Sequence, residues 1–357
     1  MKRTVDYTAL ITPVSREEVR DFRRSMKGSG SEWATVSVGQ GLAAGGVLGF
    51  AVVFILAVSG MFARVGVQGL QDNPGNPVAA FFAGFPLLVA VGIIATAVGL
   101  LVRTLTGSVW ATRLRLHRFA AANGLVFSPS QSNPLYPGAI FGQGDGRRVT
   151  NRLSSAEGRF LDIGNYTYST GSGKNRTTHR WGFMALHLDR RLPHMVLDAT
   201  SNNGLFGGTN LPATFARDQR LSLEGDFDKH FALYAPRQYE RDALYVFTPD
   251  LMALLIDNAA PFDVEIVDDW MFVYSAKPFR SAEPAVYQRL FQIVDTVGAK
   301  TLSQTDRYVD ENIGQFAANF VAPQGARLKR SFSVVGLIVT LGLVVFGLYS
   351  CVSDIVS

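Results

Sequence analysis

Three long apolar runs that contain no ionisable side chain constrain this chain more than any other feature of its sequence. They cover residues 41–63, 78–102 and 332–352. A helix needs about 20 apolar residues to cross a bilayer, and a charged residue at its centre costs about 2.5 to 3.5 kcal/mol. Three consecutive runs of this length without charge are hard to explain as buried helices of a soluble protein. The three runs therefore predict three transmembrane helices.

The distribution of Lys and Arg predicts how these helices are oriented. Basic residues gather before the first run, after the second run and before the third: Arg16, Arg20, Arg23, Arg24, Lys27, Arg103, Arg113, Arg115, Arg118, Arg327, Lys329 and Arg330. Arg64 is the only basic residue in the loop between the first two runs, and no basic residue follows the third run. Cytoplasmic segments are enriched in Lys and Arg. We therefore expect a multi-pass plasma-membrane protein with its N-terminus inside and its C-terminus outside.

The same runs divide the chain into four parts. Residues 1–37 form a cytoplasmic N-terminal segment, and residues 38–103 hold the first two membrane helices. Residues 104–331 form a cytoplasmic domain, and residues 332–357 form the third membrane helix and a short outer tail. Trp33 and Trp110 fall at the expected inner interface, where indole rings are favoured.

An amphipathic helix is predicted within the N-terminal segment. Ser15 and Glu18 form an S-x-x-E capping box, and Val19, Phe22 and Met26 follow at helical spacing. This helix could lie on the anionic inner leaflet or pack on the soluble domain. Its acidic residues dilute the positive face and favour the second interpretation.

Within residues 104–331, the order of predicted strands, short turns and inserted helices predicts an α+β fold, with a largely antiparallel sheet and flanking helices. Strands are expected at 160–168, 181–188, 194–199, 221–224, 231–234, 244–247, 262–267 and 270–274. Helices are expected over 110–123, from Thr248-Pro249 onward, and over about 282–302. The polar stretch 169–178 reads as a hairpin loop.

Composition excludes several classes of function. The net charge of +5 comes from residues beside the apolar runs, and the domain lacks a basic patch interleaved with aromatics, so nucleic-acid binding is not expected. The single cysteine, Cys351, excludes an intramolecular disulfide and a cysteine metal cluster. The apolar runs hold none of the ionisable groups that ion and proton pathways need. A transporter is therefore not expected either.

The candidates for chemistry in the domain are Asp226, Asp228 and His230. On a strand, these alternating residues would share one face and could present a metal, with His194 or Asp198 as further ligands. The alternative is a solvated strand entry with no ligand. Gly171-Ser-Gly-Lys174 does not match the phosphate-loop spacing. No nucleophile motif is present, and no cofactor is expected.

Small residues on the first run suggest a helix-packing face. Gly41, Gly45 and Gly49 recur every four residues, which would let a second helix approach closely. The alternative is that glycine is simply common in membrane helices. A packing face would serve a homo-oligomer or a larger complex, alongside contact with membrane lipids.

Part of the domain resembles a known group of proteins. The segments Leu223-Glu-Gly-Asp-Phe-Asp-Lys-His-Phe-Ala-Leu-Tyr234 and Ala243-Leu-Tyr-Val-Phe-Thr-Pro-Asp-Leu-Met252 are similar to a domain of unknown function in uncharacterised bacterial membrane proteins. The resemblance covers about residues 221–275. It implies a membrane context for the domain and assigns no catalytic residue.

These observations favour a non-enzymatic membrane protein. Its cytoplasmic domain would bind a protein partner or sense a signal at the inner leaflet. The first alternative is a membrane-bound hydrolase, with or without a metal, that uses Asp226, Asp228 and His230. The second alternative is a subunit of a larger membrane complex.

Overall fold

A computed structural model describes residues 4–30, 33, 39–105, 108–203, 209–223, 225–306, 308, 310 and 321–331 of the chain. The chain forms two compact units, one of residues Ile11–Arg118 and one of Met1–Leu10 with Phe119–Ser357. The third expected membrane helix, 332–352, lies outside the described residues.

The first unit begins with a capped helix. Helix α2 spans Arg16–Ser25. The Ser15 hydroxyl accepts a hydrogen bond from the Glu18 backbone N–H at 3.1 Å, and the Glu18 carboxylate accepts one from the Ser15 N–H at 2.7 Å. The predicted capping box is confirmed. Helix α6 (Ser108–Ala122), which runs from this unit into the second, corresponds to the helix expected over 110–123. The short helix α1 (Thr8–Ile11) lies mostly in the second unit.

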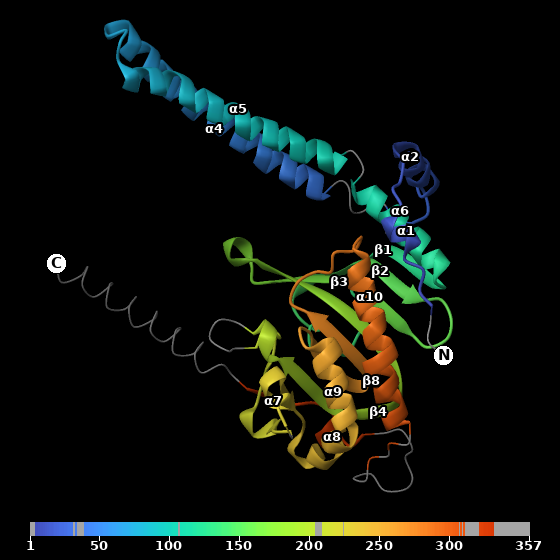
Figure 1. Ribbon diagram of the computed structural model, residues 1–357. Helices are drawn as coiled ribbons and strands as arrows, with labels where there is room; N and C mark the ends of the chain where they lie inside the picture. The colour runs from blue at the N-terminus through green and yellow to red at the C-terminus, as the bar shows by residue number, and fades with distance from the viewer. Residues whose placement is uncertain are drawn as a thin grey trace, which may run out of the picture. The chain divides into compact units, whose positions relative to one another are not determined.

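Two long apolar helices, α4 (Gly39–Asp72) and α5 (Pro77–Leu105), form a hairpin in this unit (Figure 1). Within the described residues, these two helices are long and apolar enough to cross a membrane. Most of their described side chains are exposed or half-buried, with Val53 66% and Leu88 71% exposed. A soluble protein would bury such residues.

Helix α4 extends further than the apolar run that predicted it. It passes Arg64 and ends at Asp72, immediately before the Asn73–Asn76 turn. Helical hydrogen bonding does not require apolar side chains, so the helix continues until the Pro74-Gly75 pair ends it. The apolar composition predicted where the helix lies, and the Pro-Gly pair determines where it ends.

Close helix packing in the hairpin occurs at a glycine that the sequence analysis did not select. A methyl group on Gly66 would overlap the backbone of Ala83, so only glycine fits this crossing. Gly41, Gly45 and Gly49 belong to α4, but their surroundings lie outside the described side chains. Their role in packing stays a prediction.

The second unit holds a seven-stranded sheet in the order β1-β2-β3-β4-β7-β6, with β8 paired to the other edge of β4. Every pairing is antiparallel, which confirms an α+β fold with a largely antiparallel sheet. The strands are β1 (Leu125–Ser132), β2 (Asp145–Ser155), β3 (Leu161–Thr170), β4 (Thr177–Ala199), β6 (Arg220–Leu221), β7 (Phe231–Tyr234) and β8 (Asp263–Ser275).

Two pairs of predicted strands are single long strands in the structure. Strand β4 joins the expected strands 181–188 and 194–199, and β8 joins 262–267 and 270–274. Asp268, predicted to lie in a turn, adopts a φ of 54° within β8. The register of β4 and β8 shifts between His187 and Met195, opposite this residue. An irregularity of this kind bends a strand without ending it.

The helices of the second unit include one that was predicted as a strand. Residues 244–247 fall in α8 (Glu240–Val246) and just after it, because Ala243 and Val246 are buried at helical spacing. Helix α9 (Pro249–Ala259) starts at the predicted cap. Helix α10 (Pro284–Ile293), a π-helical turn (Val294–Gly298) and α11 (Ala299–Thr305) make up the last predicted helix. Helices α9 and α10 lie side by side against one face of the sheet (Figure 1).

Aromatic residues form a core cluster that draws on β2, β3, β4, β8 and the segments covering them. It includes Phe141, Tyr166, Phe183, Phe272 and Tyr274. Leu328, close to the end of the described chain, belongs to the same cluster. Strand β9 (Arg330–Ser331) then pairs with β5 (Thr214–Phe215). The segment that leads toward the third apolar run is therefore packed into the domain.

Candidate functional site

The three residues predicted to share a strand face lie on a short helix instead. Helix α7 spans Phe227–His230, with Asp226 at its N-cap. Residues two apart on a helix point to nearly opposite sides, so Asp228 does not share a face with Asp226 and His230. Asp228 accepts hydrogen bonds from the Ser222 hydroxyl and the Leu223 N–H. Its carboxylate therefore caps a local turn.

His194 lies elsewhere, on β4. Ala199 of the same strand pairs with Phe231, next to His230, five residues further along. Five strand residues span roughly 17 Å. The four candidate residues do not converge. Within the described part of the chain, no three His, Cys, Asp or Glu side chains gather to hold a metal.

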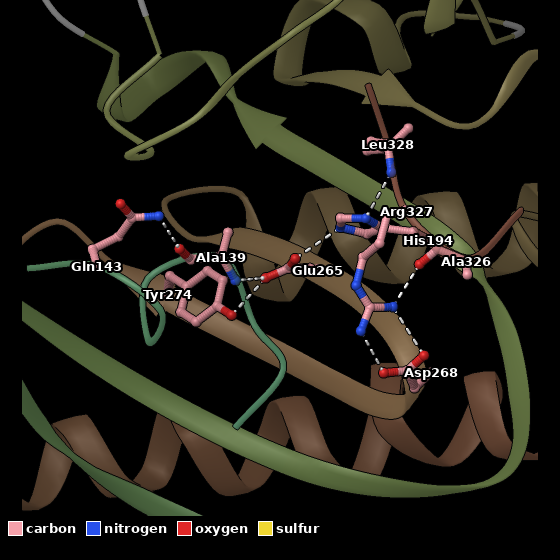
Figure 2. A network of polar contacts seen from close by, with 9 residues as sticks. All are labelled: Ala139, Gln143, His194, Glu265, Asp268, Tyr274, Ala326, Arg327 and Leu328. Atoms are coloured by element: carbon pink, nitrogen blue, oxygen red, sulfur yellow. Dashed lines mark hydrogen bonds and ion pairs between the residues drawn. The ribbon is translucent and has the colours of Figure 1, made fainter. Parts of the chain in front are cut away.

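His194 instead belongs to a buried polar network that the sequence did not predict. Its Nε2 lies 2.8 Å from Glu265 Oε1, and the exposed fractions of the two residues are 7% and 1%. Glu265 Oε2 accepts hydrogen bonds from Tyr274 Oη at 2.6 Å and from the Ala139 N–H at 2.8 Å. Figure 2 shows these groups converging on the Glu265 carboxylate.

The hydrogen bonds of His194 fix its tautomer. The backbone N–H of Leu328 donates to Nδ1 at 3.0 Å, so Nδ1 must be the acceptor. The ring proton then sits on Nε2 and is donated to Glu265. Burial, together with the Glu265 carboxylate, raises the pKa of Tyr274 well above its ordinary value, and the phenol stays a donor. The network is a neutral imidazole and a carboxylate that accepts three hydrogen bonds.

A second contact lies beside this network. Arg327 donates to both oxygens of Asp268 at 2.9 Å (Figure 2). The carboxylate of Asp268 and the neighbouring charge of Glu265 both raise the pKa of Arg327. The guanidinium group of Arg327 therefore places a positive charge near the buried Glu265 carboxylate. This charge lowers the free-energy cost of burying Glu265.

We call residues 321–331 the C-terminal strap. Besides the bond from Leu328 to His194, the side chain of Gln219 accepts from the Lys329 N–H at 2.9 Å and donates to the Lys329 carbonyl at 2.8 Å. The Ala216 N–H also donates to that carbonyl at 3.1 Å. The short helix α12 (Pro323–Ala326) lies at the start of the strap, where Gly325 packs closely against Tyr239. The strap is thus bonded to the domain along most of its length.

This arrangement can hold a segment in place. Both ring nitrogens of His194 are hydrogen-bonded, and the groups around it are a carboxylate, a buried phenol and backbone amides. The network therefore acts as a fastening, which joins β4, β8 and the C-terminal strap.

The sequence did carry one signal for this network. The stretch 262–267 alternates apolar and acidic residues, which predicted a strand. Asp263 and Glu265 in this strand are both buried. The partners of Glu265 come from residues 139, 194 and 274, and only tertiary structure brings them together.

Aromatic and cationic side chains cluster within the first unit. The rings of Trp33 and Trp110 stack at 6.2 Å, and Phe22 meets Trp33 edge-on at 5.7 Å. The guanidinium group of Arg113 lies 4.8 Å from the centre of the Trp110 ring. Burial lowers the pKa of Arg113. Tryptophan and arginine together are typical of a membrane–water interface.

An antiparallel α+β domain with an apolar helical hairpin in the same chain is compatible with a membrane-associated protein. No family model and no curated protein matches the chain, so the resemblance of residues 221–275 stays a prediction. One solved structure, the mycobacterial trehalose monomycolate transport factor A (TtfA), is similar over 52% of this chain and 96% of that chain. The two are 13% identical with a TM-score of 0.32, a likeness that carries no inference about this chain.

Proposed function

We propose that this chain is a multi-pass protein of the bacterial plasma membrane whose α+β domain is an interaction or sensing module at the inner leaflet. The outward-facing apolar side chains of α4 and α5 support membrane insertion. The basic residues beside the apolar runs support an N-terminus and a domain in the cytoplasm and a C-terminus outside.

The fastening of the C-terminal strap is the observation that carries this proposal. The strap ends at Ser331, and the third apolar run starts at the next residue. The hydrogen bond from Leu328 to His194 links the start of that run to Glu265 in the middle of the sheet. If residues 332–352 form the predicted third membrane helix, its displacement would act on buried groups of the domain, as a sensing or coupling module requires.

A cysteine-labelling experiment tests the topology. The only native cysteine is Cys351, so Cys351→Ser gives a cysteine-free background. In that background, Ser357→Cys should react with a membrane-impermeant maleimide in intact cells. Ser172→Cys, in the β3–β4 hairpin loop, should react only after the membrane is permeabilised. The reverse pattern would overturn the orientation.

Photocrosslinking tests the interaction role in native membranes. Leu135 is 96% exposed, and Leu244 and Tyr245 are further exposed apolar side chains of the domain. A photoreactive amino acid at one of these positions should give a discrete protein adduct. The same amino acid at the exposed Ser172 is the control and should give no such adduct. If none of the three positions gave an adduct, the interaction role would be refuted.

A further inference from the structure

Two aspartates face each other where the β4–β8 ladder ends. Leu197 pairs with Val264, so Asp198 and Asp263 are the next residues across the two strands. Their exposed fractions are 4% and 0%. Like charges directly opposite each other destabilise a sheet, and burial increases that cost. Something must compensate two carboxylates at this corner.

Neither carboxylate forms an ion pair with a described Lys or Arg side chain. Asp198 Oδ1 accepts a hydrogen bond from the Thr209 hydroxyl at 3.0 Å. Asp263 Oδ1 accepts from the Ala199 N–H at 2.9 Å and from the Asn202 amide at 3.1 Å. These hydrogen bonds come from neutral donors, so no ion pair among the described residues offsets the two buried carboxylates when both are ionised.

Several polar atoms at this corner are buried without a hydrogen-bond partner. They are Asp263 Oδ2, Asn202 Oδ1 and Asn203 Oδ1. Asn203 and Asn210 lie beside the pair, because a side-chain hydrogen bond from Asn203 lowers the pKa of Asp198 and one from Asn210 lowers that of Asp263. Buried polar atoms normally find partners, so several unpartnered atoms around one carboxylate pair need an explanation.

We propose that Asp198 and Asp263, together with side-chain oxygens of Asn202, Asn203, Thr209 and Asn210, bind one divalent cation of the calcium class. Every donor is a carboxylate, amide or hydroxyl oxygen, and Ca²⁺ takes six to eight such ligands. Zn²⁺ prefers the nitrogen and sulfur ligands that are missing from this set. The two charges of the cation would balance the two carboxylates.

The asparagine side chains can adapt to such a cation. The Nδ2 atom of Asn202 now points to Asp263 and donates to it. A half-turn of the amide about its last bond exchanges its nitrogen for its oxygen, so the same side chain can serve a carboxylate or a cation. Six oxygen-bearing side chains satisfy the lower end of the Ca²⁺ range without any contribution from the backbone. This site is independent of the membrane role proposed above.

Thermal unfolding of the full-length protein in detergent tests the cation site. After removal of metals with a chelator, Ca²⁺ should raise the Tm saturably, by about 5 to 10 °C at a hundredfold excess over its dissociation constant. Asp198→Asn and Asp263→Asn should each abolish this rise, and Asp226→Asn, at the exposed N-cap of α7, should keep it. Mg²⁺ at equal ionic strength should raise the Tm less, because it demands stricter geometry.

Terbium luminescence provides a second readout that does not depend on stability. The Asp198 carboxylate raises the pKa of Tyr234, which places this phenol near the proposed site. Bound Tb³⁺, a probe for Ca²⁺ sites, should be sensitised by Tyr234. Tyr234→Phe should weaken the emission and leave the Ca²⁺-dependent rise in Tm intact. An excess of Ca²⁺ should displace Tb³⁺ and so weaken the terbium emission of the natural protein.

Three results would overturn the proposal. One is a Tm that responds to pH near neutrality but to neither cation, which would mean that the aspartate pair shares a proton instead. Another is a Ca²⁺ response that survives Asp263→Asn. The third is terbium emission that Tyr234→Phe leaves unchanged. If Asp263→Asn does not fold, Asp198→Asn and Tyr234→Phe still decide the question.

Discussion

At the scale of single residues, the buried network depends on a histidine that is both donor and acceptor. His194 donates to Glu265 and accepts from the Leu328 N–H, and neither bond can be replaced by water at a site this deeply buried. Removing one partner of a buried polar contact leaves the other unsatisfied, which costs more than the bond contributed.

His194→Ala should therefore lower the free energy of unfolding by about 2 to 4 kcal/mol, because two polar groups lose their partner. Chemical denaturation of the full-length protein in detergent, followed by tryptophan fluorescence, measures this loss. His230→Ala, at a half-buried histidine on α7, should cost much less. Equal losses for both variants would contradict the fastening role of His194.

The pH dependence of stability is a second residue-scale prediction. Burial is the main cause that raises the pKa of Asp263 from 3.8 to about 7, and the neighbouring Asp198 adds to it. Between these two pKa values the folded protein holds a proton that the unfolded chain releases, so stability falls as pH rises. The loss should reach at most about 4 kcal/mol in chelator.

A series of denaturation curves from pH 5 to pH 8 in chelator would measure this slope. Asp263→Asn should flatten it, because amide and protonated acid are both neutral. If the variant kept the slope of the natural protein, the loss of stability would come from other groups.

At the scale of elements, the C-terminal strap is held to the domain by side-chain and backbone hydrogen bonds. Strand β9 contributes only two residues of pairing, so the side chains of His194 and Gln219 supply much of its attachment. Gln219 is buried and bonds both the N–H and the carbonyl of Lys329. The loss of one such side chain should release the strap before the sheet unfolds.

Limited trypsin digestion can detect this release, because Arg327, Lys329 and Arg330 are all cleavage sites in the strap. Gln219→Ala should accelerate cleavage there several-fold and leave cleavage at Arg176, in the β3–β4 hairpin loop, unchanged. Mass spectrometry of the fragments distinguishes the two sites. Equal acceleration at both sites would indicate general destabilisation.

At the scale of the whole molecule, the chain combines an apolar hairpin with a domain that has its own core. Few of the described side chains of the hairpin are buried, and the domain buries aromatic residues against both β4 and β8. The two parts are therefore adapted to different solvents. Hydrocarbon favours the exposed apolar surface of the hairpin, and water favours the domain.

Membrane extraction tests this division of the molecule. The full-length protein should remain in the membrane pellet after alkaline carbonate washing and dissolve only in detergent. A variant that ends at Ser331 should also remain, because α4 and α5 are still present. Release of that variant by carbonate would mean that the hairpin does not span the bilayer.

The sequence by itself determined the apolar hairpin, the capping box at Ser15 and the antiparallel α+β class of the domain. These features depend on local composition and periodicity, and therefore on residues that are close together in sequence. The helix start at Thr248-Pro249 and the strand Phe231–Tyr234 were predictable for the same reason.

Only the tertiary structure decided the continuity of β4 and β8, the helical state of residues 240–246 and the composition of both buried clusters. His194 and Glu265 are 71 residues apart, and His194 and Leu328 are 134 apart, so no local pattern could connect them. Asp226 and Asp228 looked more promising because they are close together in sequence. The pairing of β4 with β8 instead places Asp198 and Asp263 near each other, because Leu197 pairs with Val264 across strands that are distant in sequence.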